Sequence, residues 1–317
     1  MTKVMSDIIL KTSGLSFFYG THRGIENISL EVKRGEVFGF LGPNGAGKTT
    51  ALRLFMDVIR PTAGSAKIFG LDCQKQGVQI RKKVGYLPGE FSLYPNMTAR
   101  DFLDVSASLR PTGADDHFRE QLYERLDFDP SRKMKTYSRG NKQKIGLIAA
   151  FMNKPELLIL DEPTGGLDPL MQHVVAELIN EAKDTGRTTF FSSHILPEVQ
   201  DVCDRVAIIR QGRLIKTDSV HSLIEQQFKR LRLHFTSPPP PDSFKQKGVT
   251  EIGRNEQWIA FEITSNMPEF MQQAASYGIE ELESLPVTLD EIFMSLYSDQ
   301  SEAQDQEAIR HQGENDA

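Results

Sequence analysis

The chain has 317 residues, of which 39% are hydrophobic and 25% charged, with a formal net charge of −6. These values are ordinary for a soluble globular protein of one or two domains, and two cysteines exclude a disulfide framework. The longest apolar run, 145–152, is too short for a membrane span and residues 1–11 lack a signal-peptide core, so we expect a cytoplasmic protein that does not cross a membrane by itself.

The charge is unevenly distributed along the chain. Residues 300–317 carry five acids against one base, Arg310, a net charge of −4 that leaves −2 for the rest. A nearly neutral body gives no support to a nucleic-acid-binding surface, so we expect no direct contact with nucleic acid. The polar segment 299–317 has no periodic apolar pattern, and we predict that it is a disordered acidic tail.

The first elements of the chain surround a glycine-rich loop. Residues 8–13 and 25–32 predict strands, 35–41 predicts a turn and a buried strand, and 51–56 predicts a helix. The loop between the last two fits the phosphate-binding pattern G-x-x-x-x-G-K-[ST] at every fixed position. It consists of Gly42, Pro43, Asn44, Gly45, Ala46, Gly47, Lys48, Thr49 and Thr50.

A loop of this kind between a strand and a helix predicts a nucleotide site. The glycines let consecutive backbone N–H groups face one anion, and the helix N-terminus adds the positive end of its dipole. Lys48 brings a positive charge to the outer phosphates, and the Thr49 hydroxyl offers a hard oxygen to Mg²⁺. The alternative is a glycine-rich turn of some other α/β protein.

The middle of the chain predicts a parallel sheet with a helical insertion. Apolar residues at mixed three- and four-residue spacing across roughly 89–140 indicate helices. Two short, continuously apolar strands at 157–160 and 188–192 suit a parallel sheet that is covered on both faces. Residues 206–210 and 213–216 flank a Gln-Gly turn and predict a hairpin. The predicted fold class is therefore α/β.

Polar side chains follow both apolar strands. Asp161 and Glu162 come after the first strand and His194 after the second, where ligand sites form in parallel sheets. We expect Asp161 to hold Mg²⁺ and Glu162 to polarise the water that attacks the γ-phosphate. His194 is expected to donate a hydrogen bond to that phosphate. With Lys48, these residues form the predicted catalytic and metal-binding set.

Two helix N-termini complete this set. Asp168 is the predicted N-cap of a helix that begins at Pro169 and ends near Gly186. Ser138 and Gly140 precede another helical run, and a serine, a glycine and a helix N-terminus can bind a second anion. One nucleotide loop and two anion sites in each chain predict a dimer in which this segment caps the partner's γ-phosphate. An ordinary helix cap is the alternative.

The last third predicts a small α+β domain at 225–298. Four consecutive prolines at 238–241 favour a stiff polyproline II loop or spacer. A strand is expected at 257–263 and a helix at 268–277, and a capping box at 288–291 opens another helix. No nucleotide-binding pattern occurs in this domain.

Taken together, the motifs resemble the ATP-binding subunits of ABC transporters over about residues 8–222. The phosphate loop corresponds to the Walker A motif, 157–162 to Walker B, 138–141 to the signature and 165–168 to the D-loop, and His194 corresponds to the switch histidine. Through these correspondences the resemblance assigns Ser138, Gly140 and Asp168 to nucleotide binding.

The resemblance also implies the domain organisation. It implies a P-loop NTPase core of ABC type over 1–224, with an antiparallel β subdomain and a helical subdomain at about 89–140. The C-terminal domain is then a small α+β appendage to this core. Tyr19 takes the place of the aromatic residue that stacks on adenine in the family, with a core aromatic as the alternative.

Two positions depart from the family pattern. The signature usually reads Ser-Gly-Gly-Gln and is Ser-Arg-Gly-Asn here, so Arg139 and Asn141 do not match. The family usually has a glutamine that reaches Mg²⁺ and the attacking water, where this chain has Gly89 followed by Glu90. Either Glu90 replaces that glutamine as a metal ligand, or the ligand is absent.

The implied function is ATP hydrolysis coupled to transport. The resemblance implies an enzyme that binds ATP and Mg²⁺, closes head-to-tail as a homodimer or heterodimer, and drives a separate permease from the inner face of the cell membrane. Residues 85–98 and 289–293 are most similar to ATPase subunits of bacterial multidrug-type (ABC-2 type) exporters. One alternative is a soluble ABC ATPase that acts on DNA or ribosomes. Another is a regulatory module that binds nucleotide without hydrolysis, which Glu162 and His194 disfavour.

Overall fold

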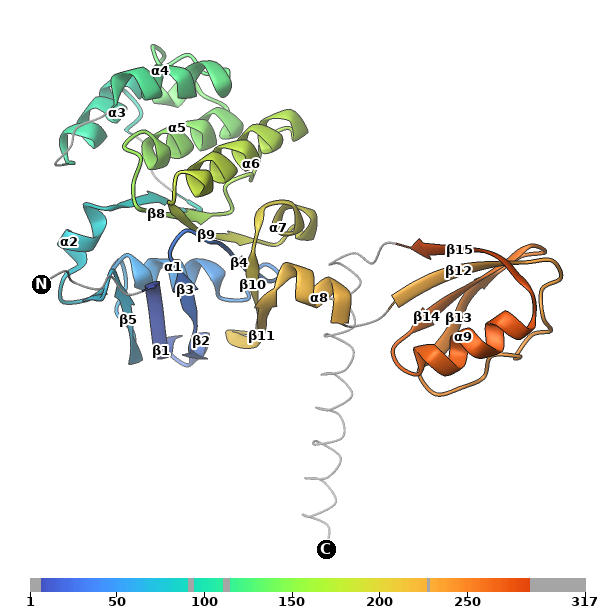
Figure 1. Cartoon of the computed structure of the whole chain (residues 1–317). Helices are drawn as coiled ribbons and strands as arrows, with labels where there is room; N and C mark the ends of the chain where they lie inside the picture. Colours follow the sequence, from blue (N-terminus) through green and yellow to red (C-terminus); the bar gives the residue numbers. More distant parts are fainter. Residues whose placement is uncertain (1–6, 91–93, 111–114, 227–228, 286–317) are drawn as a thin grey trace, which may run out of the picture. The chain divides into compact units, whose positions relative to one another are not determined.

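The computed structural model describes residues 7–90, 94–110, 115–226 and 229–285 (Figure 1). The chain divides into two compact units between Ser219 and Val220. Helix α8 (Val220–Gln226) opens the second unit, so the boundary drawn from the sequence after residue 224 falls inside this helix. None of the helices in the described ranges has the length and apolar character needed to cross a bilayer.

The first unit is built on a six-stranded sheet in the order β11-β10-β4-β9-β8-β7. Its strands are β4 (Val37–Leu41), β7 (Val84–Leu87), β8 (Leu157–Asp161), β9 (Thr188–Ser193), β10 (Arg205–Arg210) and β11 (Arg213–Ser219). All neighbours pair in parallel except β11, which is antiparallel to β10. Every residue of β4, β8 and β9 is buried, which confirms the predicted parallel sheet with two covered faces.

An antiparallel sheet holds the beginning of the chain, in the order β2-β1-β5-β6 with β3 also paired to β1. The strands are β1 (Ile8–Tyr19), β2 (His22–Ile28), β3 (Glu31–Lys33), β5 (Ala63–Ile68) and β6 (Leu71–Asp72). β1 continues beyond the predicted strand 8–13 and ends at Tyr19, opposite His22 of β2. One apolar core joins the two sheets, and its aromatic centre is Phe190, whose ring lies 5.4–5.6 Å from those of Phe38, Phe40 and Phe55.

The helices of this unit lie around the parallel sheet; α3 and α4 fall in the region 89–140 that was predicted to be helical, and α5, which begins at its end, packs beside them (Figure 1). They are α1 (Lys48–Phe55), α2 (Gly77–Arg81), α3 (Ala99–Ser108), α4 (Asp116–Arg125), the 3₁₀ turn η1 (Met134–Thr136), α5 (Arg139–Phe151), α6 (Pro169–Asp184) and α7 (Leu196–Val202). The Asp168 carboxylate accepts a hydrogen bond from Met171 N at 3.0 Å, which confirms the predicted N-cap of α6.

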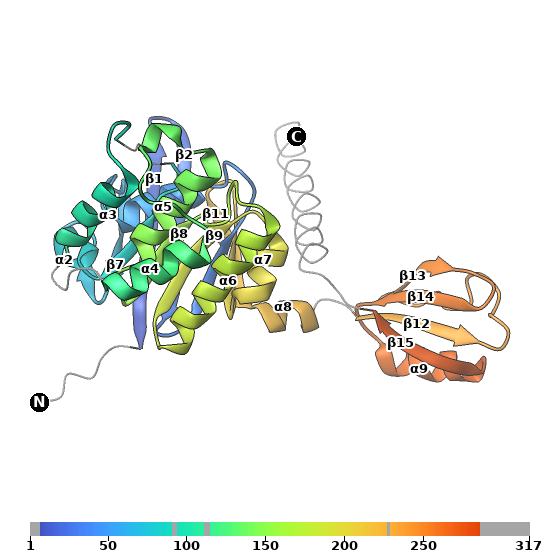
Figure 2. The same ribbon diagram turned by 90° about the horizontal axis from the view of Figure 1, so that it is seen from above.

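The second unit contains a four-stranded antiparallel sheet in the order β13-β14-β12-β15, with α9 on one face (Figure 2). Its elements are β12 (Lys229–Phe235), β13 (Val249–Arg254), β14 (Trp258–Ile263), α9 (Met267–Ser276) and β15 (Ile279–Leu285). β14 and α9 confirm the predicted strand and helix. The proline run lies inside this unit, between β12 and β13. The predicted capping box at 288–291 and the acidic tail lie outside the described residues.

Candidate nucleotide site

The phosphate loop connects β4 to α1 and closes around the ammonium group of Lys48. Gly47 caps α1 with φ of 105°, and a Cβ atom at this position would lie 2.5 Å from the Gly24 carbonyl oxygen, so only glycine fits. Lys48 is buried at the first position of α1 and donates to the carbonyls of Gly42 at 2.7 Å and Pro43 at 3.1 Å. The loop therefore holds a positive charge at its centre.

Three neighbouring strands bring the predicted catalytic residues together. β9 lies between β4 and β8, so the loops that follow these strands meet at one edge of the sheet. A carboxylate oxygen of Glu162 lies 3.3 Å from Lys48 Nζ and 3.2 Å from His194 Nδ1. Residues separated by more than a hundred positions thus form one polar contact, as the pattern of strand ends predicted.

Asp161, the residue before Glu162, has one carboxylate oxygen unpaired. The residue is fully buried, and its Oδ1 accepts a hydrogen bond from Ser192 Oγ at 2.6 Å. Its Oδ2 is also buried and has no hydrogen-bond partner among the described residues. A buried carboxylate oxygen without a partner is costly unless a cation satisfies it. The unpaired oxygen therefore fits a cation such as Mg²⁺, and Thr49, the predicted second oxygen donor, lines the pocket above the phosphate loop.

A pocket of about 310 Å³ opens above the phosphate loop. Its lining residues come from the β1–β2 hairpin, the phosphate loop and the end of β8; they are Tyr19, Arg23, Gly24, Asn44, Gly45, Gly47, Lys48, Thr49, Thr50 and Glu162. Tyr19 is 46% exposed, and its hydroxyl lies 3.4 Å from Thr50 Oγ1. Its accessible ring lies where a planar base can stack. Arg23 and Gly24 were not predicted from the sequence, because they belong to no motif and reach the pocket through the hairpin.

Comparisons with known proteins decide the family. Residues 25–165 match the ABC transporter family. A bacitracin transport ATP-binding protein of Bacillus licheniformis is 38% identical over 212 residues, which are 66% of this chain and 69% of that protein. The chain belongs to the ABC transporter ATP-binding proteins. A further ABC transporter ATP-binding protein, from Nostoc, is 41% identical over 210 residues, 64% of this chain, and the match spans only 62% of that relative's length.

Solved structures agree with this assignment. An ATP-binding subunit of an ABC transporter is 29% identical, covers 69% of this chain and 92% of its own, and gives a TM-score of 0.62. A bacterial ABC transporter cassette solved as a dimer has the same TM-score at 21% identity, over 67% of this chain and 99% of its own, and supports the fold. ABC ATP-binding cassettes bind ATP with Mg²⁺ and hydrolyse it, and the predicted ABC fold, ATP and Mg²⁺ are confirmed at the level of the family.

The unusual loop of this ABC protein, at Gly89 and Glu90, lies against the Asp161 carboxylate. A Cβ atom at Gly89 would lie 2.8 Å from Asp161 Oδ2, so a larger residue at this position, including the glutamine that is usual in the family, would displace the carboxylate. The Glu90 side chain is exposed, does not line the pocket and makes no ion pair with any described residue.

Burial, together with the charge of Asp161, raises the pKa of Tyr86 to about 12, so the hydroxyl group of this β7 residue stays neutral.

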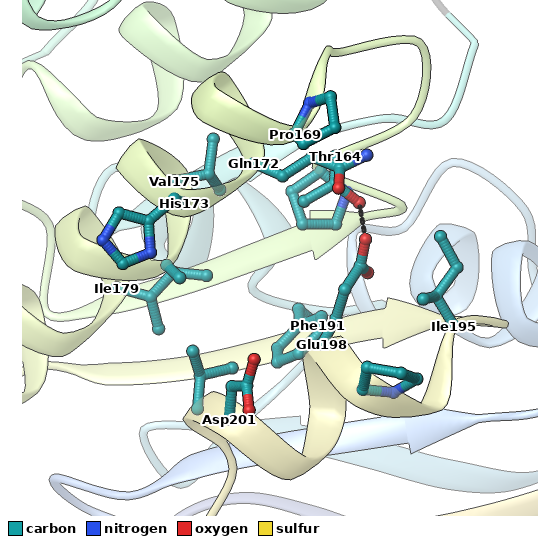
Figure 3. Close-up of a pocket in the computed structure, with 14 residues that line it drawn as sticks. Thr164, Pro169, Gln172, His173, Val175, Ile179, Phe191, Ile195, Glu198 and Asp201 are labelled. Atoms are coloured by element: carbon teal, nitrogen blue, oxygen red, sulfur yellow. Dashed lines mark hydrogen bonds between the residues drawn. The ribbon is translucent and has the colours of Figure 1, made fainter. Parts of the chain in front are cut away.

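Glu198 of α7, which was not predicted from the sequence, joins the two catalytic loops. Its carboxylate accepts from Thr164 Oγ1 at 2.5 Å and from Ser193 Oγ at 2.8 Å. Thr164 lies two residues after Glu162, and Ser193 directly precedes His194. Figure 3 shows the Thr164–Glu198 bond at the edge of a pocket of about 290 Å³ that residues of α6 and α7 line. A carboxylate thus ties the loop after β8 to the loop after β9.

The predicted signature residues are not part of the pocket of their own chain. Ser138 caps α5, with its Oγ accepting from Asn141 N at 3.3 Å, and Gly140 follows in the first turn. A Cβ atom at Gly140 would lie 2.8 Å from the Gly166 carbonyl oxygen, so α5 packs closely on the loop before Asp168. None of these residues lines the pocket above the phosphate loop.

Proposed function

We propose that this chain is the ATP-hydrolysing subunit of an ABC exporter. In this proposal it binds ATP and Mg²⁺, dimerises head-to-tail and drives a separate membrane permease. The observation that carries the proposal is the contact of Glu162 with both Lys48 and His194 at the phosphate loop, directly after Asp161 with its unpaired buried oxygen. A phosphate anchor, a base and a hydrogen-bond donor then meet where a γ-phosphate would lie.

Each of these residues has a separate role in the proposed reaction. Lys48 binds the outer phosphates, Glu162 accepts a proton from the attacking water, and His194 donates to the γ-phosphate. Thr49 and Asp161 would hold Mg²⁺, which would neutralise phosphate charge. Tyr19 stacks on the adenine. The catalysis is positioning and electrostatics, without a covalent intermediate.

The ion pair between Lys48 and Glu162 suggests how ATP prepares the base. Lys48 also donates to two loop carbonyls, so the phosphates must compete with these groups for its ammonium. As Lys48 turns toward the phosphates, its attraction for the Glu162 carboxylate weakens and the carboxylate becomes available to water. Lys48 and the attacking water thus compete for the same carboxylate.

The proposed dimer is supported by predicted nucleotide-binding residues that do not line the pocket of their own chain. Ser138, Gly140 and Asp168 lie away from the pocket of their own chain, and we propose that they complete the pocket of a partner. The 21%-identical cassette that was solved as a dimer supports this arrangement. We propose a homodimer, with a heterodimer of two similar chains as the alternative.

Export and the permease rest on the relatives. The Bacillus licheniformis protein is named for bacitracin transport, and we propose a related export role for this chain at the cytoplasmic face of the membrane. The permease would be a separate chain.

The test is to measure ATP hydrolysis with Mg²⁺ by the purified full-length chain and to identify the membrane protein that co-purifies with it. Tight ATP binding without turnover would contradict the proposal and favour a regulatory module. Nucleic acid or ribosomes in place of a membrane protein would favour the soluble alternative.

A further inference from the structure

Gln143 connects the signature helix to the catalytic loop of its own chain. Its side chain is 9% exposed, and Nε2 donates to the carbonyl oxygens of Glu162 and Pro163, each at 3.0 Å. Because both partners are acceptors, the amide group must present its nitrogen to them. The two bonds run from the second turn of α5 to the backbone that directly follows β8.

The backbone that Gln143 holds is in an uncommon conformation. Glu162 has φ of 49°, in the left-handed region that side chains other than glycine rarely adopt. Its N–H lies between two acceptors on Ser192, the carbonyl at 3.2 Å and Oγ at 3.1 Å. Its carbonyl accepts from Gly165 N as well as from Gln143. The direction of the Glu162 carboxylate therefore depends on β9 at one end of the residue and on α5 at the other.

The same helix carries the residues proposed to touch the partner's nucleotide. Ser138 and Gly140 lie within five residues of Gln143 on α5, and Gly140 is in close contact with Gly166. An α-helix moves as a rigid element over so short a distance. A shift of the α5 N-terminus therefore reaches the Glu162 carbonyl through one side chain.

We propose that Gln143 is a positioning residue that couples the seating of Ser138 and Gly140 on the partner's ATP to the orientation of Glu162 in its own site. This inference rests on the proposed head-to-tail dimer. It gives each ATP site a direct connection to the other, since the helix that caps one γ-phosphate also holds the base that acts on the other.

The first experiment compares Gln143→Met with Lys144→Met in the full chain. Lys144 is a matched control, because it lies on the same helix, is 8% exposed and donates to a carbonyl, that of Asp127 at 3.2 Å, away from the catalytic loop. We expect Gln143→Met to lower kcat by about ten-fold or more, since small misplacements of a catalytic group are costly. The KM for ATP should stay within about two-fold.

Lys144→Met should lose a similar amount of thermal stability and keep a kcat within about two-fold of the unaltered chain. Gln143→Lys retains a donor of similar reach and should restore most of the lost rate, which a purely structural role would not require. Equal kcat values for Gln143→Met and Lys144→Met, or a Gln143→Lys chain as slow as Gln143→Met, would overturn the role of Gln143 and leave the proposed function standing.

The second experiment tests the connection across the dimer with heterodimers purified through two different tags. The reference carries Ser138→Arg in one chain, which removes the partner's site. The altered chain keeps its own site, but its Ser138 is no longer seated, so we expect this remaining site to work well below half the rate of the unaltered dimer. Adding Gln143→Met to the same chain should then slow it little further, because the connection is already broken, and adding it to the other chain should change nothing. A remaining site at half the rate of the unaltered dimer, or a full further ten-fold loss on adding Gln143→Met to the same chain, would overturn the coupling and leave the proposed function standing.

Discussion

The two units of this chain bury different kinds of residues. In the described ranges, every polar or charged residue that is buried as a whole belongs to the first unit, including Lys48, Gln143 and Asp161. The second unit buries an apolar set around the rings of Phe244, Phe261 and Phe270, with centroids 4.8–5.6 Å apart. Its ion pairs, such as the contact between Arg230 and Glu262, are partly exposed.

This difference in buried polar residues suggests that the first unit carries out the chemistry and that the second does not. Burial of polar groups costs free energy unless each group is paired, so natural domains keep such groups where a reaction or a ligand requires them. Asp161 retains an unpaired oxygen in the first unit, and Glu162 adopts an unfavourable φ there. The described part of the second unit also has buried polar atoms without a partner, Arg232 Nε and Gln246 Nε2, and positive φ at Asp242 and Asn266, but none of its polar residues is buried as a whole. We infer that this unit serves association or regulation rather than ATP chemistry.

The sharpest test of this contrast is Lys48→Ala. Loss of the ammonium removes the charge at the centre of the phosphate loop, and we expect ATP hydrolysis to fall by about 1,000-fold, with ATP binding strongly weakened. Lys144→Ala, which also removes a buried lysine from the first unit, is the control for burial alone. Equal losses in the two variants, measured by ATPase assay and nucleotide titration, would contradict a special role for Lys48.

Glu162→Gln should have the next largest effect. The amide keeps the size of the side chain and cannot accept the proton of the attacking water, so we expect hydrolysis to slow by about 100-fold or more. ATP binding should be retained, and an ATP-bound dimer should accumulate and be visible by light scattering. Normal turnover in this variant would remove Glu162 from the catalytic step and weaken the comparison of the two units.

The arrangement of Lys48, Glu162 and His194 could be predicted because backbone rules determine it. Each residue follows a buried strand, and the C-terminal ends of neighbouring parallel strands meet at one edge. Gln143 and Glu198 could not be found in this way. Each is a single polar residue on a helix, and its partners depend on how that helix packs against loops that are distant in the sequence.

The second unit shows a similar limit for strands. Residues 230–235 alternate Arg, Leu, Arg, Leu, His and Phe, a two-residue period that indicates β12, although no strand was predicted there. β15 has no such signal, since the sequence Ile-Glu-Glu-Leu-Glu-Ser-Leu is almost entirely exposed in an edge strand. This strand is defined by its backbone pairing with β12, and the pattern of its side chains does not predict it.

The loop at Gly89 and Glu90 allows a smaller and more specific test of the metal site. A methyl group at Gly89 would press on the unpaired Asp161 oxygen, and we expect Gly89→Ala to raise the Mg²⁺ concentration for half-maximal ATPase by about ten-fold. Glu90→Ala should raise it by only about two- to three-fold, because that carboxylate is exposed. An unchanged Mg²⁺ requirement in Glu90→Ala would show that Glu90 does not replace the missing glutamine of the family.

The smallest effect on ATP binding is expected from removal of the second unit. Truncation after Gln226 keeps α8 intact, and the affinity for ATP should stay within about two-fold of the full chain, because the nucleotide site and its core belong to the first compact unit. The same truncation should change the ATP-dependent balance of monomer and dimer, or the co-purification of the permease, since we propose that this unit tunes association. Truncation after residue 299, which removes only the acidic tail, is the control and should change neither property. The truncated chain could remain folded, as judged by circular dichroism, and yet no longer bind ATP. The second unit would then be part of the nucleotide site, and the contrast between the two units would fail.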